Sequence, residues 1–211
     1  VHSYGLIEGS SRGPAQVRSI KRKSFSPSLF VLHFGLEGTF DIPHHTILFG
    51  PRYKGLVGDI YKGGKLASDP ALYLHHPTIT DPMMAPEGCS TFYALAPVPH
   101  MGKAEVDWEK EGAAYAEVIL DTLAERLIPD IRERIRVMFH YTPQDFNTDL
   151  SAHLGSAFSL EPVLWQSAWF RTHNRDDKIR NLYFVGAGTH PGAGIPGVVG
   201  SAEATAGLML A

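Results

Sequence analysis

The sequence predicts an α/β protein of the α+β type: a mixed or antiparallel sheet with helices, followed by a C-terminal strand, glycine-rich loop and helix. Three observations support this class. Short β-rich apolar segments separated by proline- and glycine-rich turns fill much of the first half. A long amphipathic helical pattern covers 108–127, and 181–210 is dense in glycine and alanine. The order of the elements favours a mixed or antiparallel sheet.

Residue periodicity and turn signals place the elements in order along the chain. We expect strands at 28–34, 46–49, 72–76, 90–95, 137–141 and 182–185. We expect helices at 56–61, 108–127, 129–136 and 197–210, while 146–150 stays ambiguous. In the longest helix Asp107 is the expected N-cap, and Glu109 and Glu111 suit the positive end of the helix dipole.

Composition limits the functional classes. With 44% hydrophobic and 19% charged residues, the 211-residue chain is an ordinary globular one, with room for one substantial core or two small ones. A net charge of -3 gives no reason to expect a nucleic-acid partner. The single cysteine, Cys89, suits a reducing compartment. Without a secretory or membrane-spanning apolar run, we expect a cytoplasmic protein with at most peripheral membrane contact.

The glycine-dense loop after 182–185 is the main candidate site. Glycines let a backbone approach a ligand closely, and a helix start offers free N–H groups and a positive dipole end. The segment therefore suits an anionic or electron-rich ligand, although a glycine-rich turn that only packs a terminal helix is the alternative. Gly192, Gly194 and Gly197 match G-x-G-x-x-G, but several residues separate Val185 from Gly192 and no ribose-binding acid follows. We therefore expect half of a cofactor site rather than a complete dinucleotide fold.

The same segment resembles a known family. The most specific match is 181–202, NLYFVGAGTHPGAGIPGVVGSA, which is similar to the C-terminal signature of the bacterial-type, FAD-dependent phytoene desaturases. Upstream segments resemble that family in the same order: SLFVLHFGL at 28–36, HHTILFGPRY at 44–53, APEG at 85–88, YALAPVPH at 93–100 and GSAFSLEPVLWQSAWFR at 155–171. The resemblance covers about 26–211.

The resemblance implies an FAD-dependent oxidoreductase of carotenoid biosynthesis that desaturates phytoene toward lycopene, with hydride transfer from allylic carbons to the flavin. It implies a peripheral membrane location and allows a homo-oligomer. The family's N-terminal G-x-G-x-x-G turn has no counterpart in this sequence, so we expect only the C-terminal half of such an enzyme. The implied parts are an unrelated or flexible leader at 1–25, a substrate-domain portion at 26–175 and the C-terminal part of the FAD-binding domain at 176–211. A non-catalytic fragment that cannot hold FAD alone, or a related carotenoid or diapocarotenoid dehydrogenase, is the alternative.

The resemblance also implies the site residues. The residues expected near FAD are Gly186, Gly188, Thr189, His190, Gly194, Ile195, Pro196, Gly197 and Val198. The first of these would approach the ribityl and phosphate region, and those from Ile195 onward would approach the isoalloxazine ring. His190 is either an acid–base group or a loop hydrogen-bonder, and no side chain identifies itself as the catalytic base. For a polyene channel the candidates are Phe158, Trp165, Trp169 and Phe170, with core packing as the alternative.

Two other patterns point to different chemistry. The adjacent pairs His44–His45 and His75–His76 invite a metal hypothesis, but neighbours on a strand point to opposite faces, so we expect no metal site. The segment 9–13 matches the G-x-S-x-G nucleophile elbow of hydrolases, which needs a strand before it and a helix after it. Because Pro14 follows at once, we expect a flexible leader there instead.

Overall fold

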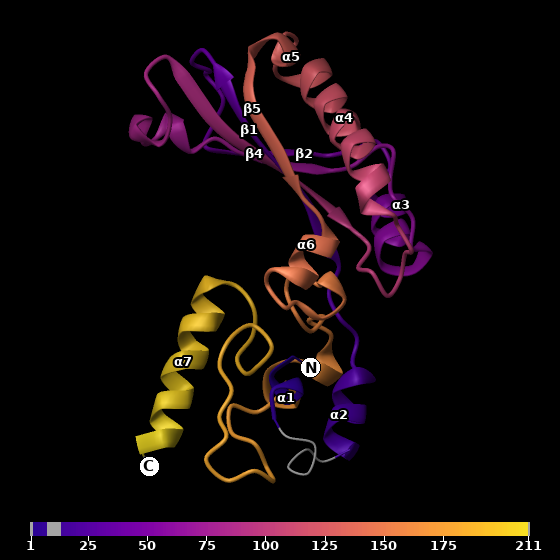
Figure 1. Cartoon of the computed structure of the whole chain (residues 1–211), viewed down its shortest axis with the longest axis vertical. Helices are drawn as coiled ribbons and strands as arrows, with labels where there is room; N and C mark the ends of the chain where they lie inside the picture. Colours follow the sequence, from indigo (N-terminus) through magenta and orange to yellow (C-terminus); the bar gives the residue numbers. More distant parts are fainter. Residues whose placement is uncertain (1, 8–13, 211) are drawn as a thin grey trace. The chain divides into compact units, whose positions relative to one another are not determined.

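The structure, a computed structural model, describes residues 2–7 and 14–210 (Figure 1). The chain divides into two compact units. We call Ser28–Phe146 the sheet unit, and Val1–Pro27 together with Asn147–Ala211 the terminal unit. The segment 9–13, which carries the hydrolase-like pattern, lies outside the described residues.

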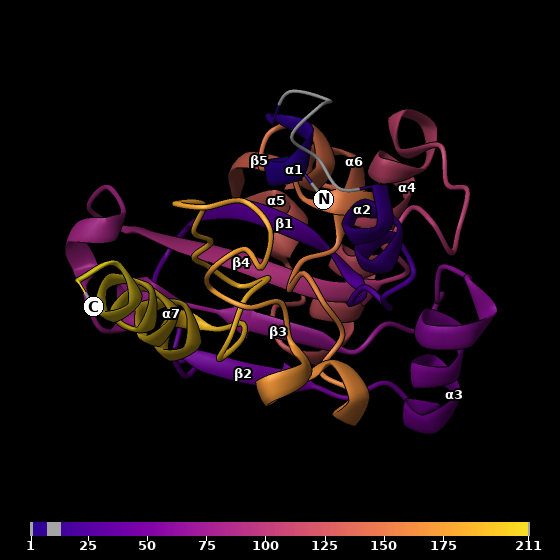
Figure 2. The same ribbon diagram turned by 90° about the horizontal axis from the view of Figure 1, so that it is seen from below.

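The sheet unit is built on one five-stranded sheet with the strand order β2-β3-β4-β1-β5 (Figure 2). All of its strand pairings are antiparallel, which confirms the predicted fold class. The strands are β1 (Ser28–Glu37), β2 (His45–Leu48), β3 (Leu72–His75), β4 (Cys89–Val98) and β5 (Ile135–Tyr141). The two long central strands, β1 and β4, pair from Ser28↔Val98 to Glu37↔Cys89, so they fix the register of the sheet.

Alternation along the strands places the core on one face of the sheet. Leu32 and Phe34 of β1 and Phe92 of β4 are buried, and they belong to the same apolar cluster as the helix residues Ile119 and Leu123. Those residues lie on α4 (Trp108–Arg126), the helix predicted at 108–127. Burying each such side chain contributes about 1.5–3 kcal/mol, so this one helix supplies much of the stability of the sheet unit.

Asp107 is the N-cap residue of α4, as predicted, but its side chain makes no capping hydrogen bond to the helix. Its carboxylate instead accepts from the Lys110 ammonium at 2.5 Å, while the Asp107 carbonyl accepts from the Glu111 N–H at 2.8 Å. A charged partner three residues ahead therefore competes with the backbone N–H groups for this carboxylate.

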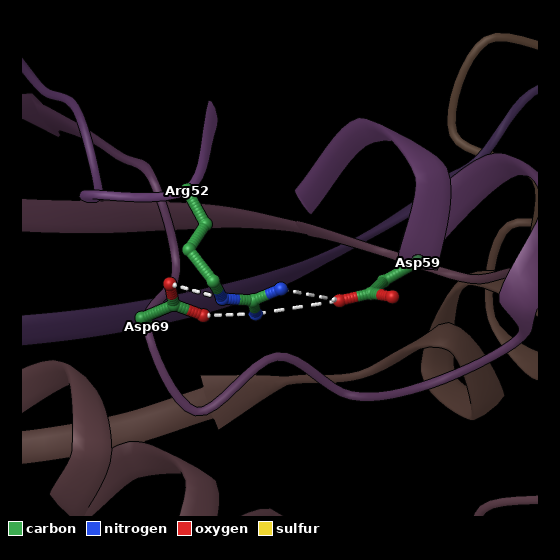
Figure 3. A network of polar contacts seen from close by, with 3 residues as sticks. All are labelled: Arg52, Asp59 and Asp69. Carbon is green, nitrogen blue, oxygen red and sulfur yellow. Dashed lines mark hydrogen bonds and ion pairs between the residues drawn. The ribbon is translucent and has the colours of Figure 1, made fainter. Parts of the chain in front are cut away.

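The remaining elements of the sheet unit are short. They are α3 (Tyr53–Gly58), a π-helical turn (Asp59–Gly63), the 3₁₀ turns Pro77–Ile79 and Pro82–Met84, and α5 (Ile131–Arg134). Helix α6 (Pro143–Thr148) contains the boundary between the two units. The helix predicted at 129–136 is thus reduced to α5, because Ile135 and Arg136 already belong to β5. At the start of α3, the Arg52 guanidinium bridges Asp69 at 2.6 Å and Asp59 at 3.3 Å (Figure 3).

The terminal unit combines helices with loops. Its elements are α1 (His2–Gly5), α2 (Pro14–Lys21), the 3₁₀ turns His153–Gly155, Leu164–Gln166 and Ala168–Phe170, and the long α7 (Ile195–Leu210). Backbone hydrogen bonds from Ser26 to Ser159 at 2.8 Å and from Glu161 to Ser24 at 3.0 Å tie its two chain segments together.

The strand predicted at 182–185 is wrong for the described structure. Tyr183 makes only an isolated bridge to Arg175, and Val185 is exposed. The apolar sequence therefore has β-propensity but no neighbouring strand to complete a ladder among the described residues. Among the residues that the structure describes, no helix is both long enough and apolar enough to cross a membrane.

Candidate functional site

The loop before α7 has the backbone shape that the glycine pattern predicted. Gly186 has φ +117° and Gly194 has φ +87°, a region that side-chain-bearing residues rarely adopt. A Cβ at either position would meet nothing within 4 Å, so the main chain is bare toward open space at both ends of the loop. Such a surface lets a ligand approach the peptide groups directly.

A buried polar cluster fixes this loop to α7. We call Asn174, Thr189, Ser201 and Thr205 the polar pin, since all four are buried and hydrogen-bonded to one another. The Ser201 hydroxyl lies 2.7 Å from that of Thr189 and accepts from the Gly186 N–H at 3.1 Å. The Thr205 hydroxyl donates to the Ser201 carbonyl, 2.7 Å away and four residues earlier in the helix.

The amide of Asn174 is the centre of the polar pin. Its nitrogen lies 3.0 Å from the His190 carbonyl, 3.0 Å from the Ser201 hydroxyl and 3.1 Å from the Thr205 hydroxyl. An amide nitrogen carries two protons, so these acceptors share its donations. The buried polar groups on both sides of the loop are therefore satisfied internally, and the loop backbone is held without help from a ligand.

The Arg171 side chain also holds the glycine loop, through hydrogen bonds to a loop carbonyl. Its guanidinium is buried and donates to the carbonyls of Ala187 and Leu160. Burial lowers its pKa, although an arginine remains charged at any physiological pH. By taking up the Ala187 carbonyl, the guanidinium fixes the orientation of a peptide group in the middle of the glycine loop.

Helix α7 begins at Ile195, two residues before the predicted start at 197. Its first backbone bond runs from the Val198 N–H to the Gly194 carbonyl at 2.9 Å. Ile195 is 83% exposed, so the helix start faces open space. A Cβ on Gly197 would lie 2.7 Å from the Gly192 carbonyl oxygen, so only glycine allows the first turn to pack this closely on the loop. Four of the predicted flavin residues (Gly194, Ile195, Gly197 and Val198) therefore meet at one exposed helix start.

The other predicted loop residues have structural roles in the described structure. A Cβ on Gly188 would lie 3.0 Å from the Ser159 hydroxyl, so this position also needs a small residue. Thr189 belongs to the polar pin, and Pro196 is in the first turn of α7, where its missing N–H costs no helix bond.

His190 serves as a loop hydrogen-bonder. Its backbone N–H donates to the Thr172 carbonyl at 3.0 Å, and its Nδ1 lies 3.1 Å from the Ala168 carbonyl. A carbonyl only accepts, so Nδ1 carries the proton in this contact. The ring also lines a pocket of about 580 Å³ in the terminal unit, together with Trp169, His173 and Leu208. Both protein contacts hold the loop in place, which agrees with the structural interpretation of this side chain.

The four aromatic residues proposed for a polyene channel are exposed. Phe158, Trp165, Trp169 and Phe170 each expose about half of the side chain or more, and Trp169 is 75% exposed. None of the four is therefore buried by the described residues of this chain. Trp169 packs against His173, with ring centroids 5.4 Å apart.

A second candidate surface lies on the sheet face opposite the core, and the sequence did not reveal it. The register aligns one residue from each strand into what we call the aromatic row: Phe139, His33, Tyr93, His75 and His45. Adjacent rings pack along it, with centroid distances of 4.8 Å for His33–Phe139 and 4.6 Å for His75–Tyr93. The signal was the period-two alternation of each strand, but only the pairing register shows that the rings line up.

The histidine pairs differ from each other. His76 is buried on the core face and stacks on Phe92, whereas His75 lies on the opposite face, as strand alternation requires. The same rule does not hold for His44 and His45, because β2 begins only at His45. One ligand atom from each of His44, His45 and His75 can be chosen so that all three lie within 4.8 Å of one another. The alternation of side chains along a strand therefore does not keep His44 and His45 apart, and that argument against a metal site is wrong for this pair.

Comparison with known proteins identifies the relatives of the chain. A scan against protein-family models gives no match. The chain is 61% identical to the phytoene desaturase (lycopene-forming) of Paracoccus sp. (strain N81106 / MBIC 01143), over 100% of this chain and 42% of that protein. It is 52% identical to the phytoene desaturase (neurosporene-forming) of Cereibacter sphaeroides, over 98% of this chain and 41% of that protein.

A more distant relative is the 4,4'-diapophytoene desaturase (4,4'-diapolycopene-forming) of Methylomonas sp., which is 36% identical over 90% of this chain and 37% of that protein. The chain thus spans about two fifths of the length of the relatives it matches. Together with the terminal glycine motif, the level and extent of identity show that the chain is similar along nearly its whole length to a part of bacterial phytoene desaturases.

Proposed function

We propose that the chain is the C-terminal part of an FAD-dependent phytoene desaturase that converts phytoene toward lycopene. The observation that carries this proposal is the 61% identity, across the whole chain, to a protein named as a lycopene-forming phytoene desaturase. The identity falls to 36% for a diapophytoene desaturase, which favours phytoene as the substrate. A diapocarotenoid substrate remains the alternative within the same reaction class.

The glycine loop fits a large electron-rich cofactor. Gly186 and Gly194 leave bare backbone facing open space, and the start of α7 adds N–H groups and a positive dipole end. When bound, FAD supplies the hydride acceptor for the desaturation. The residues of this chain would place their N–H groups where negative charge develops, and Arg171 and the polar pin would keep those groups aligned.

The aromatic row is our candidate surface for the polyene. Phytoene is an extended apolar chain, and flat aromatic side chains give a long apolar contact surface with few conformational degrees of freedom. Phe139 in the row and Val137, two residues earlier on β5, add exposed apolar area to this surface. The exposed cluster Trp165, Trp169 and Phe170 is a second apolar surface, which belongs to the terminal unit.

That second surface also supports peripheral contact with a membrane. Trp and Phe beside Lys suit the interface between lipid headgroups and acyl chains. Lys23 donates to the Phe170 carbonyl at 3.2 Å, so a cation lies directly beside the exposed aromatic residues. Phytoene is a lipid-soluble substrate, and contact with a membrane would give the enzyme access to it.

The alternative, a fragment that does not hold FAD alone, is favoured by helix α7. This helix buries the polar residues Ser201 and Thr205 and exposes Val199, Met209 and Leu210. Most helices of globular proteins show the reverse pattern. An exposed apolar face of this size suits contact with a further part of such an enzyme, and homo-oligomer formation is a second way to cover it.

A flavin titration distinguishes the two readings. The chain as given, and the same chain joined to the remaining part of the Paracoccus relative, are titrated with FAD and followed by flavin fluorescence. We expect binding by the joined protein, conversion of phytoene in liposomes to lycopene, and weaker binding after Gly186→Ala, since φ +117° disfavours any side chain. Gly207→Ala, on the far part of α7, is the matched control. A joined protein that folds but neither binds FAD nor desaturates phytoene would refute the proposal.

A further inference from the structure

Three histidines gather at one end of the aromatic row. His45 opens β2 and pairs across the ladder with His75, the last residue of β3, while His44 comes immediately before β2. The ring centroids lie 4.4 Å apart for His44–His45, 4.7 Å for His44–His75 and 5.4 Å for His45–His75. All three belong to the sheet unit, so their arrangement depends on that unit alone.

Hydrogen bonds orient two of the three rings from outside the group. The Nδ1 of His44 lies 2.6 Å from the Thr80 hydroxyl, and the Nδ1 of His45 lies 2.7 Å from the Tyr73 hydroxyl. Metal-binding histidines characteristically use one ring nitrogen for such a partner, which fixes the ring and leaves the other nitrogen for the metal. On His44 that other nitrogen, Nε2, points toward His75.

The contacts inside the group leave one ring nitrogen without a hydrogen-bond partner among the described residues. The Nε2 atoms of His44 and His75 are 2.8 Å apart, a contact that two neutral rings satisfy only if one nitrogen carries the proton. The Nδ1 of His75 is buried and has no hydrogen-bond partner among the described residues.

We propose that His44, His45 and His75 form a binding site for a divalent zinc ion. Three imidazoles with an open fourth position are a set that zinc accepts, whereas magnesium and calcium require oxygen ligands. Zinc–nitrogen bonds of about 2.0–2.1 Å at tetrahedral angles place two ligand nitrogens about 3.3 Å apart. The separation of 2.8 Å between the His44 and His75 nitrogens therefore needs to open by only about half an ångström.

Zinc in this site would have a defined mechanical effect. β2 is an edge strand of four residues, and the structure pairs it with β3. The ion would join the segment before β2 to the end of β3, and His45 is exposed, so the fourth position is open to water or to another ligand. The site therefore adds a cross-link at the edge of the sheet, beside the aromatic row.

Direct metal binding tests the proposal without any assay of desaturation. The chelator-treated chain is titrated with Zn²⁺ by calorimetry, and Co²⁺ is added separately to detect the visible absorption bands of a tetrahedral nitrogen site. We expect one zinc per chain and a higher melting temperature with zinc. His75→Gln should weaken the affinity by at least about 100-fold, and Thr80→Ala should weaken it by about 10–100-fold.

His33→Gln is the matched control, since His33 lies in the same row on β1, two strands from β3, and should leave the zinc affinity unchanged. Circular dichroism of every variant without metal separates loss of binding from loss of folding. Absence of a stoichiometric zinc site in the folded chain, or full affinity in a folded His75→Gln variant, would overturn the proposal.

Discussion

The contact between the start of α7 and the glycine loop predicts opposite effects for two substitutions in one helix. Gly197 and Gly207 both lie in α7, where alanine is the better helix former by about 0.8–1.0 kcal/mol. A Cβ on Gly207 would meet nothing within 4 Å, whereas a Cβ on Gly197 would lie 2.7 Å from the Gly192 carbonyl oxygen and 3.0 Å from its carbonyl carbon. Helix propensity is therefore matched between the two sites, and only the contact differs.

The structure sets the expected magnitudes. Gly207→Ala gains the helix preference and should stabilise the chain by up to about 1 kcal/mol. Gly197→Ala gains the same preference but forces a backbone carbonyl to move, and overpacking of this kind costs about 1–3 kcal/mol. The second variant should therefore lie about 1–3 kcal/mol below the first. The shift it imposes falls on Gly192 and the loop that we assign to the cofactor.

Urea unfolding followed by circular dichroism measures this difference directly, and hydrogen exchange of the α7 amides locates it. The slope of the transition should be the same for both variants, because neither changes the surface exposed on unfolding. If Gly197→Ala stabilises the chain as much as Gly207→Ala does, then the close packing of α7 on the loop is incorrect, and with it the reason for glycine at 197.

Three other predictions concern single side chains. Ser201→Ala removes the hydroxyl that accepts from the Gly186 N–H, and should cost about 1–3 kcal/mol in urea unfolding, while an unchanged midpoint would contradict the polar pin. Burial, followed by the Tyr73 hydroxyl, raises the pKa of Tyr93 to about 12, so its neutral form stabilises the fold below pH ~10 and this contribution is lost as the pH rises toward 12. Ultraviolet titration of Tyr93→Phe against the original chain checks that sign, since the variant should lack the late-ionising phenol. Arg52→Lys should lower the melting temperature only slightly, because the guanidinium that bridges Asp69 and Asp59 is half exposed, and a large loss would show that the network has a greater role.

Much of the fold could be read from local pattern. The β-rich runs became β1, β2, β3, β4 and β5, and the amphipathic run became α4, with ends within a few residues of expectation. These elements bury one face each, and a repeated apolar pattern specifies that face without knowledge of the partner. Asp107 shows the limit of such reasoning, because its carboxylate accepts a hydrogen bond from Lys110 and none from the N–H groups at the helix start.

The histidines show why the second surface escaped prediction. Alternation correctly separated His75 from His76, but it gave no reason to bring His44 near His75. Residues some thirty positions apart become neighbours only through the pairing register, and no local preference encodes that register. The strand expected at 182–185 failed for a related reason, since a ladder needs a partner strand as well as a suitable sequence.

By itself the sequence determined the resemblance to phytoene desaturases, the positions of the main strands and helices, and the glycine loop, because each depends on residue types at fixed spacing. Tertiary structure decided how the loop is held, through a polar pin that joins residues 174, 189, 201 and 205, and which rings share a face of the sheet. The physical reason is that glycine and apolar periodicity act through the local backbone, whereas buried hydrogen bonds and the aromatic row exist only once distant segments have met.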